Sequence, residues 1–106
     1  MSAVFDVEKL ISEVTLDRRY HEFLRISTLS SGLYVLVAGA TDKQSPHKED
    51  EIYYVVRGKA KIRISGSETP VVQGSVIFIE ANAEHRFFDI EEELVLLVFF
   101  APPESS

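Results

Sequence analysis

The sequence predicts an all-β protein with one short helix near its N-terminus. Short apolar runs rich in β-branched and aromatic residues recur along the chain, and turn-forming residues separate them about every ten positions. Only one segment has the spacing of an amphipathic helix. The 106 residues are enough for a single domain, so we expect one domain over 1–106 built as a small β-sandwich or barrel.

The predicted helix runs from Asp6 to about Glu13. Asp6 is a favourable N-cap residue, and the apolar side chains that follow it have the i, i+3, i+4, i+7 spacing of one helix face: Val7, Leu10, Ile11 and Val14. A helix of this length is not stable by itself in water. We therefore expect its apolar face to pack against the barrel.

Strands are expected over about 20–101, at 20–26, 33–38, 52–56, 60–64, 71–72, 76–79, 86–89 and 94–100. Residues 60–64 alternate apolar and basic side chains, which is typical of a strand with one buried and one solvated face. Ser65, Gly66 and Ser67 predict a hairpin turn. The consecutive prolines 102 and 103 should end the last strand, and residues 104–106 are expected to fray.

Charge and composition exclude several classes of protein. Eleven basic and 17 acidic residues give a net charge of −6, which disfavours binding to nucleic acid or to an anionic membrane. There is no cysteine, so the chain has no disulfide and no thiolate chemistry. Residues 1–14 show no basic start followed by an apolar core, and no apolar run reaches membrane-spanning length, so we expect a cytoplasmic protein.

Residues 39–58 contain the main candidates for chemistry. His47 and Glu51 lie four residues apart, and on an extended segment two such side chains can point to the same side. A histidine and a carboxylate on one side are a possible metal site. His85 is the candidate for a further ligand.

The spacing in this segment resembles the first motif of the cupin superfamily. That motif places a histidine pair and a glutamate between two glycines, and here it aligns with Gly39, His47, Glu51 and Gly58. The position of the first histidine falls on Ser45, which removes one of the usual ligands.

A second cupin motif aligns with residues 74–89. Gly74 and His85 occupy its glycine and histidine positions, whereas Glu80, Asn82 and Asp89 replace the usual proline, glycine and asparagine. Asparagine is the best substitute for glycine where the backbone is left-handed. The resemblance implies a single-domain cupin jelly-roll barrel.

The resemblance also implies a divalent metal held by His47, Glu51 and His85. Two histidines and one carboxylate leave coordination positions open and suit Fe, Mn, Ni or Zn, among which the sequence does not choose. Gln44 or Glu49 could add a fourth ligand, and Ser45 could hold a coordinated water.

Strand parity extends the prediction to the neighbours of these ligands. Tyr53 has the parity of Glu51, so it should face the barrel interior either as an acid/base group or as a core aromatic. Phe87 should line the same cavity as His85, and Arg86 should point outward. Residues expected on the solvated surface are His21, Glu49 and Asp50.

The opposite parity places Ile52, Tyr54 and Val56 on the outer face of the same strand. An apolar outer face must be covered, partly by the N-terminal helix and partly by a second copy of the chain. Cupins are commonly dimers, so we expect a homodimer.

Three functions are compatible with these features. The leading one is a metal-dependent enzyme, of oxygenase or isomerase type, that acts on a small polar molecule within the barrel. The alternative is a non-catalytic module that binds a metal or small ligand, as a sensor or stabilising partner. A metal-free scaffold is least favoured, because it needs no inward histidine and glutamate.

Overall fold

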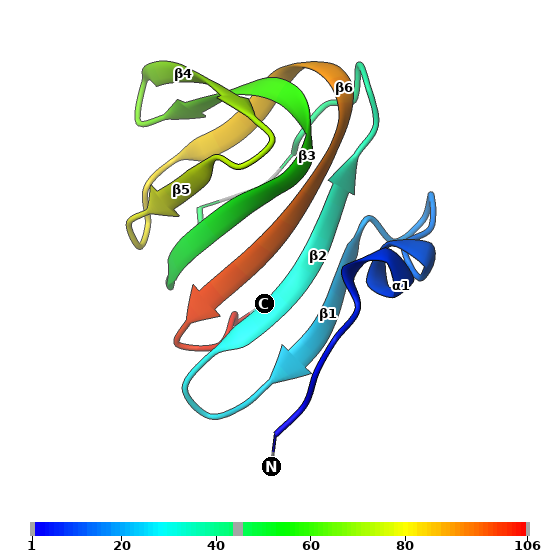
Figure 1. Cartoon of the computed structure of the whole chain (residues 1–106). Coiled ribbons are helices and arrows are strands. Elements are labelled where there is room, and N and C mark those ends of the chain that lie inside the picture. The colour runs from blue at the N-terminus through cyan, green and yellow to red at the C-terminus, as the bar shows by residue number, and fades with distance from the viewer. Residues whose placement is uncertain (1, 44–45, 106) are drawn as a thin grey trace.

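The computed structural model describes residues 2–43 and 46–105 and confirms an all-β fold with one short helix. Figure 1 shows the elements in chain order, with the helix beside the first two strands. They are α1 (Val7–Ser12), β1 (Tyr20–Arg25), β2 (Ser30–Leu36), β3 (Asp50–Ile64), β4 (Ser67–Val72), β5 (Val76–Ile79) and β6 (His85–Ala101).

All strand pairs are antiparallel, in the order β1-β2-β6-β3-β4, with β5 also paired to β3. The two long strands β3 and β6 curve strongly, so the sheet rolls over on itself (Figure 1). These two strands therefore form the middle of the sheet. Strands β2 and β1 follow β6 on one side, and β4 and β5 pair with β3 on the other. Glu51 lies near the start of β3 and His85 at the start of β6.

Each of the two long strands replaces two strands that the sequence analysis separated. The predicted segments 52–56 and 60–64 are one strand, β3, because Gly58 carries the chain through an irregular pairing with β6 instead of ending the strand. Gly58 has φ +112°, and a Cβ there would lie 2.3 Å from the carbonyl oxygen of Glu93. Only glycine fits this crossing without strain. Similarly, the predicted strands 86–89 and 94–100 are one strand, β6, which continues through Asp89 at φ 48°.

Side chains alternate along β3 as the parity argument predicted. Glu51, Tyr53 and Val55 are buried, whereas Ile52 and Tyr54 are exposed. The inward apolar side chains of β3, β5 and β6 form the main core, whose largest fully buried members include Tyr53, Phe87 and Phe100.

Helix α1 docks on the barrel as expected. The carboxylate of Asp6 accepts a hydrogen bond from the backbone N–H of Lys9 at 3.2 Å, which caps the helix. Leu10 packs in a second apolar cluster with Leu33, Val35 and Val95, and Val56 lies against that cluster. The helix therefore stabilises the outer face of β2 and β6. In the described part of the chain no helix is long and apolar enough to cross a membrane.

The rest of the outer apolar face is open to solvent. Ile52, Tyr54, Phe78 and Phe99 are between 39% and 60% exposed, and Ile52 pairs directly with both Phe78 and Phe99. A second copy of the chain on this face remains a prediction, which light scattering on the purified protein would check.

The C-terminal tail differs from the expected frayed end. Strand β6 stops at Ala101, before the two prolines, as predicted. Beyond them, the backbone N–H of Glu104 donates to the hydroxyl of Ser30 at 2.9 Å, and its carbonyl accepts from the guanidinium of Arg25 at 2.7 Å. Ser105 binds Glu49. Side-chain hydrogen bonds thus hold the tail against β1, β2 and the loop before β3.

Candidate metal centre

The structure brings the three predicted ligands together. His47 in the loop before β3, Glu51 in β3 and His85 in β6 each offer one ligand atom, and these atoms all lie within 4.8 Å of one another. A backbone hydrogen bond joins the two motifs, since the N–H of Asn82 donates to the carbonyl of His47 at 2.6 Å. Asn82 has φ 67°, the left-handed conformation expected where the motif usually has glycine.

Glu51 and His85 are buried, and their ligand atoms have unused hydrogen-bonding capacity. Glu51 is 1% exposed, and neither of its carboxylate oxygens has a hydrogen-bond partner among the described residues; nor does Nε2 of His85. Glu51 Oε1 and His85 Nε2 are 3.2 Å apart, close enough for an ion pair but without the angles of a hydrogen bond. Burying a carboxylate in this way is unfavourable unless something binds it. The donor set therefore fits a divalent transition metal.

The orientation of His85 also suits a ligand. Its Nδ1 lies 3.0 Å from the carbonyl oxygen of Ala83, which can only accept a hydrogen bond. This contact places the ring proton on Nδ1 and leaves the lone pair of Nε2 directed toward Glu51. Burial alone lowers the pKa of His85, but Glu51 and the Ala83 carbonyl outweigh it and raise the pKa above its ordinary value.

A cavity of about 200 Å³ adjoins the centre. Its lining residues are Tyr20, Tyr34, His47, Glu51, Val98, Phe100 and Glu104. Four of these residues are aromatic or aliphatic, and the other three bring two carboxylates and one imidazole to the wall. This size admits only a small molecule.

Tyr20 brings a hydroxyl to this cavity. The hydroxyl is buried and has no hydrogen-bond partner among the described residues. Burial raises the pKa of Tyr20, and the nearby carboxylate of Glu104 raises it further. The ring lies directly over Gly32, where a Cβ would come within 2.2 Å of it. Glycine at this position thus makes room for the tyrosine, and the free hydroxyl can bind a ligand in the cavity.

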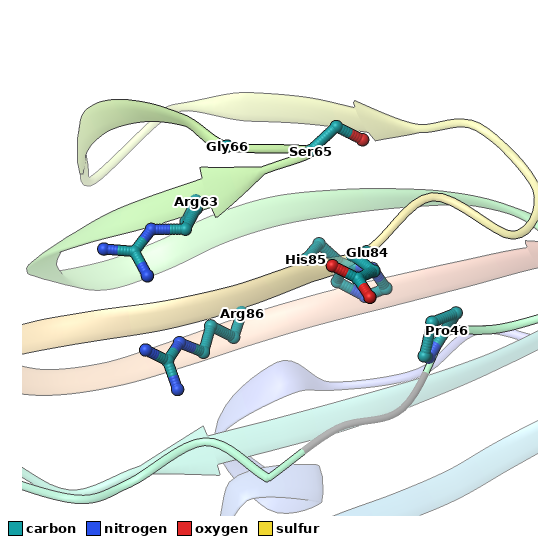
Figure 2. A pocket seen from close by; sticks show the side chains of 7 residues that line it. All are labelled: Pro46, Arg63, Ser65, Gly66, Glu84, His85 and Arg86. Atoms are coloured by element: carbon teal, nitrogen blue, oxygen red, sulfur yellow. The ribbon is translucent and has the colours of Figure 1, made fainter.

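A second hollow, of about 280 Å³, reaches His85 from the outside (Figure 2). Figure 2 shows Arg63 and Arg86 projecting side by side, away from His85, from paired positions of β3 and β6. Arg63 is bound to Glu68, whereas Arg86 is exposed, as its parity predicted. The positive groups therefore lie at the surface and not among the candidate ligands.

The remaining sequence predictions have mixed outcomes. Glu49 was expected on the surface, but it is 4% exposed and accepts two hydrogen bonds from Ser105, at 3.2 and 2.8 Å. The position of Glu49 beneath the folded tail explains this burial, and its carboxylate is not part of the ligand group found among the described residues. Asp50 is exposed as predicted, and Gln44 and Ser45 lie outside the described residues.

Tyr53 faces inward as its parity predicted. It is fully buried, with its ring 6.0 Å from that of His85 and 5.0 Å from that of Phe87. Phe87 is also buried. A role for Tyr53 in acid/base catalysis stays a prediction. The tyrosines that line the cavity beside His47 and Glu51 are Tyr20 and Tyr34.

Sequence reasoning missed Asp42, a buried carboxylate in the loop after β2. One of its oxygens accepts from the hydroxyl of Tyr34 at 2.9 Å and the other from the backbone N–H of Phe87 at 2.9 Å. Asp42 thus links Tyr34, which lines the cavity, to Phe87 in strand β6. Its distance in sequence from both partners is the reason that no local pattern indicated it.

Stability should fall at alkaline pH because of Tyr20 and Tyr34. Burial raises the pKa of both hydroxyls above the ordinary value of about 10, and for Tyr34 the Asp42 carboxylate adds to the effect. The stabilisation is therefore complete below pH ~10 and is lost as the pH rises beyond it. Urea unfolding at pH 9 and 11 should differ by roughly 1 kcal/mol for each tyrosine. Y34F should reduce this difference, whereas Y54F, at the exposed outer face, should leave it unchanged.

Comparison with known protein families agrees with the fold. A family model described as "Cupin domain" matches residues 32–100, which include all three candidate ligands. An uncharacterized protein of Streptomyces coelicolor is 48% identical over 89 residues, which cover 84% of this chain and 85% of that protein.

Solved structures share the fold at low sequence identity. TT1209 from Thermus thermophilus superposes with a TM-score of 0.77 at 22% identity, covering 94% of this chain and 97% of that one. DMSP lyase DddQ from Ruegeria pomeroyi superposes with a TM-score of 0.70 at 17% identity, covering 84% of this chain and 51% of that one. At these identities the likeness extends to the fold alone.

Proposed function

This chain belongs to the cupin family, and from that premise we propose that it is a metal-dependent enzyme acting on a small polar molecule inside its barrel. His47, Glu51 and His85 would hold one divalent ion of Fe, Mn, Ni or Zn. The observation that carries the proposal is the group of three ligand atoms that lie within 4.8 Å of one another. In this group Glu51 and His85 are buried, and both Glu51 oxygens and His85 Nε2 have no hydrogen-bond partner among the described residues.

Structural scaffolding alone does not account for this arrangement. A carboxylate that is 1% exposed and unbonded costs stability, and a protein that needed only a packed barrel would gain by replacing it with an apolar residue. Such a cost is typical of a functional site.

The proposed reaction is of oxygenase or isomerase type. A divalent ion held by two histidines and one carboxylate polarises a bound oxygen-containing group and leaves positions open for it. The residues of the chain would do the rest: the walls formed by Val98 and Phe100 exclude water, and the Tyr20 hydroxyl donates a hydrogen bond that orients the substrate. Catalysis by a fold neighbour, the DMSP lyase, is consistent with chemistry in such a barrel.

Metal analysis tests the first part of the proposal. Protein purified without chelator, or reloaded anaerobically with each of the four metals, should contain about one ion per chain. H47A and H85A should each abolish this stoichiometric binding. H21A is the matched control, because His21 lies outside the ligand group and binds Glu13. Metal content that is negligible in the wild type, or equal in all three variants, would contradict the proposal.

Binding of a small anion separates an enzyme from a non-catalytic metal module. If three protein ligands leave coordination positions open, azide added to the Co(II)-loaded protein should change its visible spectrum in a saturable manner. A spectrum that does not respond to azide would indicate a closed site and would favour the sensor or stabilising role.

A further inference from the structure

The C-terminal tail carries a carboxylate to the candidate metal centre. After β6 ends, the chain turns back toward β2, as Figure 1 shows. Three contacts described above hold the tail there: Glu104 N–H to Ser30, Glu104 carbonyl to Arg25, and Ser105 to Glu49. The side chain of Glu104 is thus presented by a fixed backbone.

The carboxylate of Glu104 meets His47. Its Oε2 lies 3.2 Å from Nδ1 of His47, and the two side chains are only 26% and 17% exposed. Both residues line the cavity that also contains Glu51. An exposed ion pair between mobile side chains contributes little, but this pair is mostly buried and one partner is anchored through its own backbone.

Glu104 contacts Nδ1 of His47 and does not belong to the group of candidate ligands. The ligand atoms within 4.8 Å of one another come from His47, Glu51 and His85, and this group, found among the described residues, does not include Glu104. A carboxylate on the remaining nitrogen of a ligand histidine fixes which ring nitrogen carries the proton and makes the other a better donor to a metal. For His85, the carbonyl of Ala83 has the same function.

We propose that Glu104 is a positioning residue for His47: its carboxylate accepts a hydrogen bond from Nδ1–H, which keeps the proton on Nδ1 and leaves the Nε2 lone pair for the metal. This inference rests on the proposed metal site, but its first consequence concerns the metal-free protein. Both histidines of the centre would then hold the same tautomer, one through a backbone carbonyl and the other through the tail.

NMR of the metal-free protein tests the proposal without reference to activity. The chain has three histidines, so two-bond ¹H–¹⁵N correlations at a pH where the rings are neutral can be assigned ring by ring. His47 should carry its proton on Nδ1 in the wild type and lose this preference in E104A. In E104Q the amide oxygen can still accept a hydrogen bond from Nδ1–H, so the preference should remain.

Metal affinity gives the second readout. By competition with a chromophoric chelator, E104A should bind Zn(II) or Co(II) about 10–100-fold more weakly than the wild type, the usual effect of losing such a partner. E104Q should recover most of this loss. E13A is the matched control, because Glu13 binds Nε2 of His21 at 2.7 Å outside the centre. E13A should alter the His21 correlations and leave both His47 and metal affinity unchanged.

The possible outcomes separate this inference from the proposed function. A wild type that binds no metal contradicts the function, whereas the His47 tautomer still confirms or overturns the contact with Glu104. If E104A leaves the His47 correlations and the affinity unchanged, Glu104 has no positioning role. Equal losses in E104A and E104Q would also overturn the proposal, since an acceptor alone would then not suffice.

Discussion

Replacing Glu51 with glutamine should weaken metal binding by more than about 100-fold and at the same time raise the melting temperature of the metal-free protein. Glutamine has the shape of glutamate but provides no anionic oxygen for a divalent ion. In the metal-free state it also removes a buried charge whose two oxygens lack hydrogen bonds among the described residues. Its amide N–H can donate to His85 Nε2, which carries a lone pair when Ala83 holds the Nδ1 proton.

The gain in stability should be about 1–3 kcal/mol, the usual cost of an unsatisfied buried polar group. For a domain of this size that corresponds to a rise of roughly 5–15 °C in melting temperature. Calorimetry after chelation and a metal competition assay would measure the two effects on one sample. The control is E84Q, the same substitution at the exposed residue beside His85, which should change neither quantity appreciably.

A loss of stability in metal-free E51Q would mean that the Glu51–His85 pair stabilises the fold. Affinity within a few-fold of the wild type would mean that Glu51 is not a ligand. Either result alone contradicts the prediction.

The substitution G58A should be the most damaging to the fold. An alanine Cβ would lie 2.3 Å from the carbonyl oxygen of Glu93 and 2.8 Å from the Cα of Leu94. In addition, the φ of +112° at position 58 is unfavourable for any residue with a side chain. The contacts are with backbone atoms of β6, which cannot rotate away. Backbone strain and overpacking each cost about 1–3 kcal/mol, so we expect a loss of roughly 2–5 kcal/mol.

Thermal and urea unfolding of G58A should show this loss as a fall of about 10–25 °C in melting temperature, or as failure to fold. G74A is the matched control. Gly74 also has positive φ, at +92°, but a Cβ there meets no atom within 4 Å, so its cost should be only about 1 kcal/mol. Equal losses in the two variants would show that strain in φ, and not the crossing with β6, determines the requirement for glycine.

Local patterns predicted much of the fold and part of the site. Helix α1 and the parity of β3 follow from spacing along a few residues, because burial on one face repeats with the period of the element. His47, Glu51 and His85 were found through motif spacing, and the structure places them together. The predicted strand breaks at Gly58 and at 90–93 were wrong, because both positions lie within continuous strands. A glycine or a polar run predicts a turn when the partner strand is not known.

The rest of the site depends on contacts between distant segments. Tyr20 reaches the cavity only because β1 pairs with β2 and leaves Gly32 beneath its ring. Glu104 follows two prolines in a short polar tail, a composition typical of frayed ends, and its backbone is held in place by Ser30 and Arg25. The sequence on either side of Tyr20 and of Glu104 contains no pattern that distinguishes these two residues from surface residues.

The hydrogen bond between the His47 loop and the Asn82 turn affects when the proposed centre could be assembled during folding. Glu51 and His85 come from β3 and β6, so the centre requires these two long strands to pair. A chain in which β6 has not yet paired with β3 would therefore lack the assembled ligand group. Metal binding at the proposed centre would then follow closure of the barrel, and an incompletely folded chain would bind the ion more weakly.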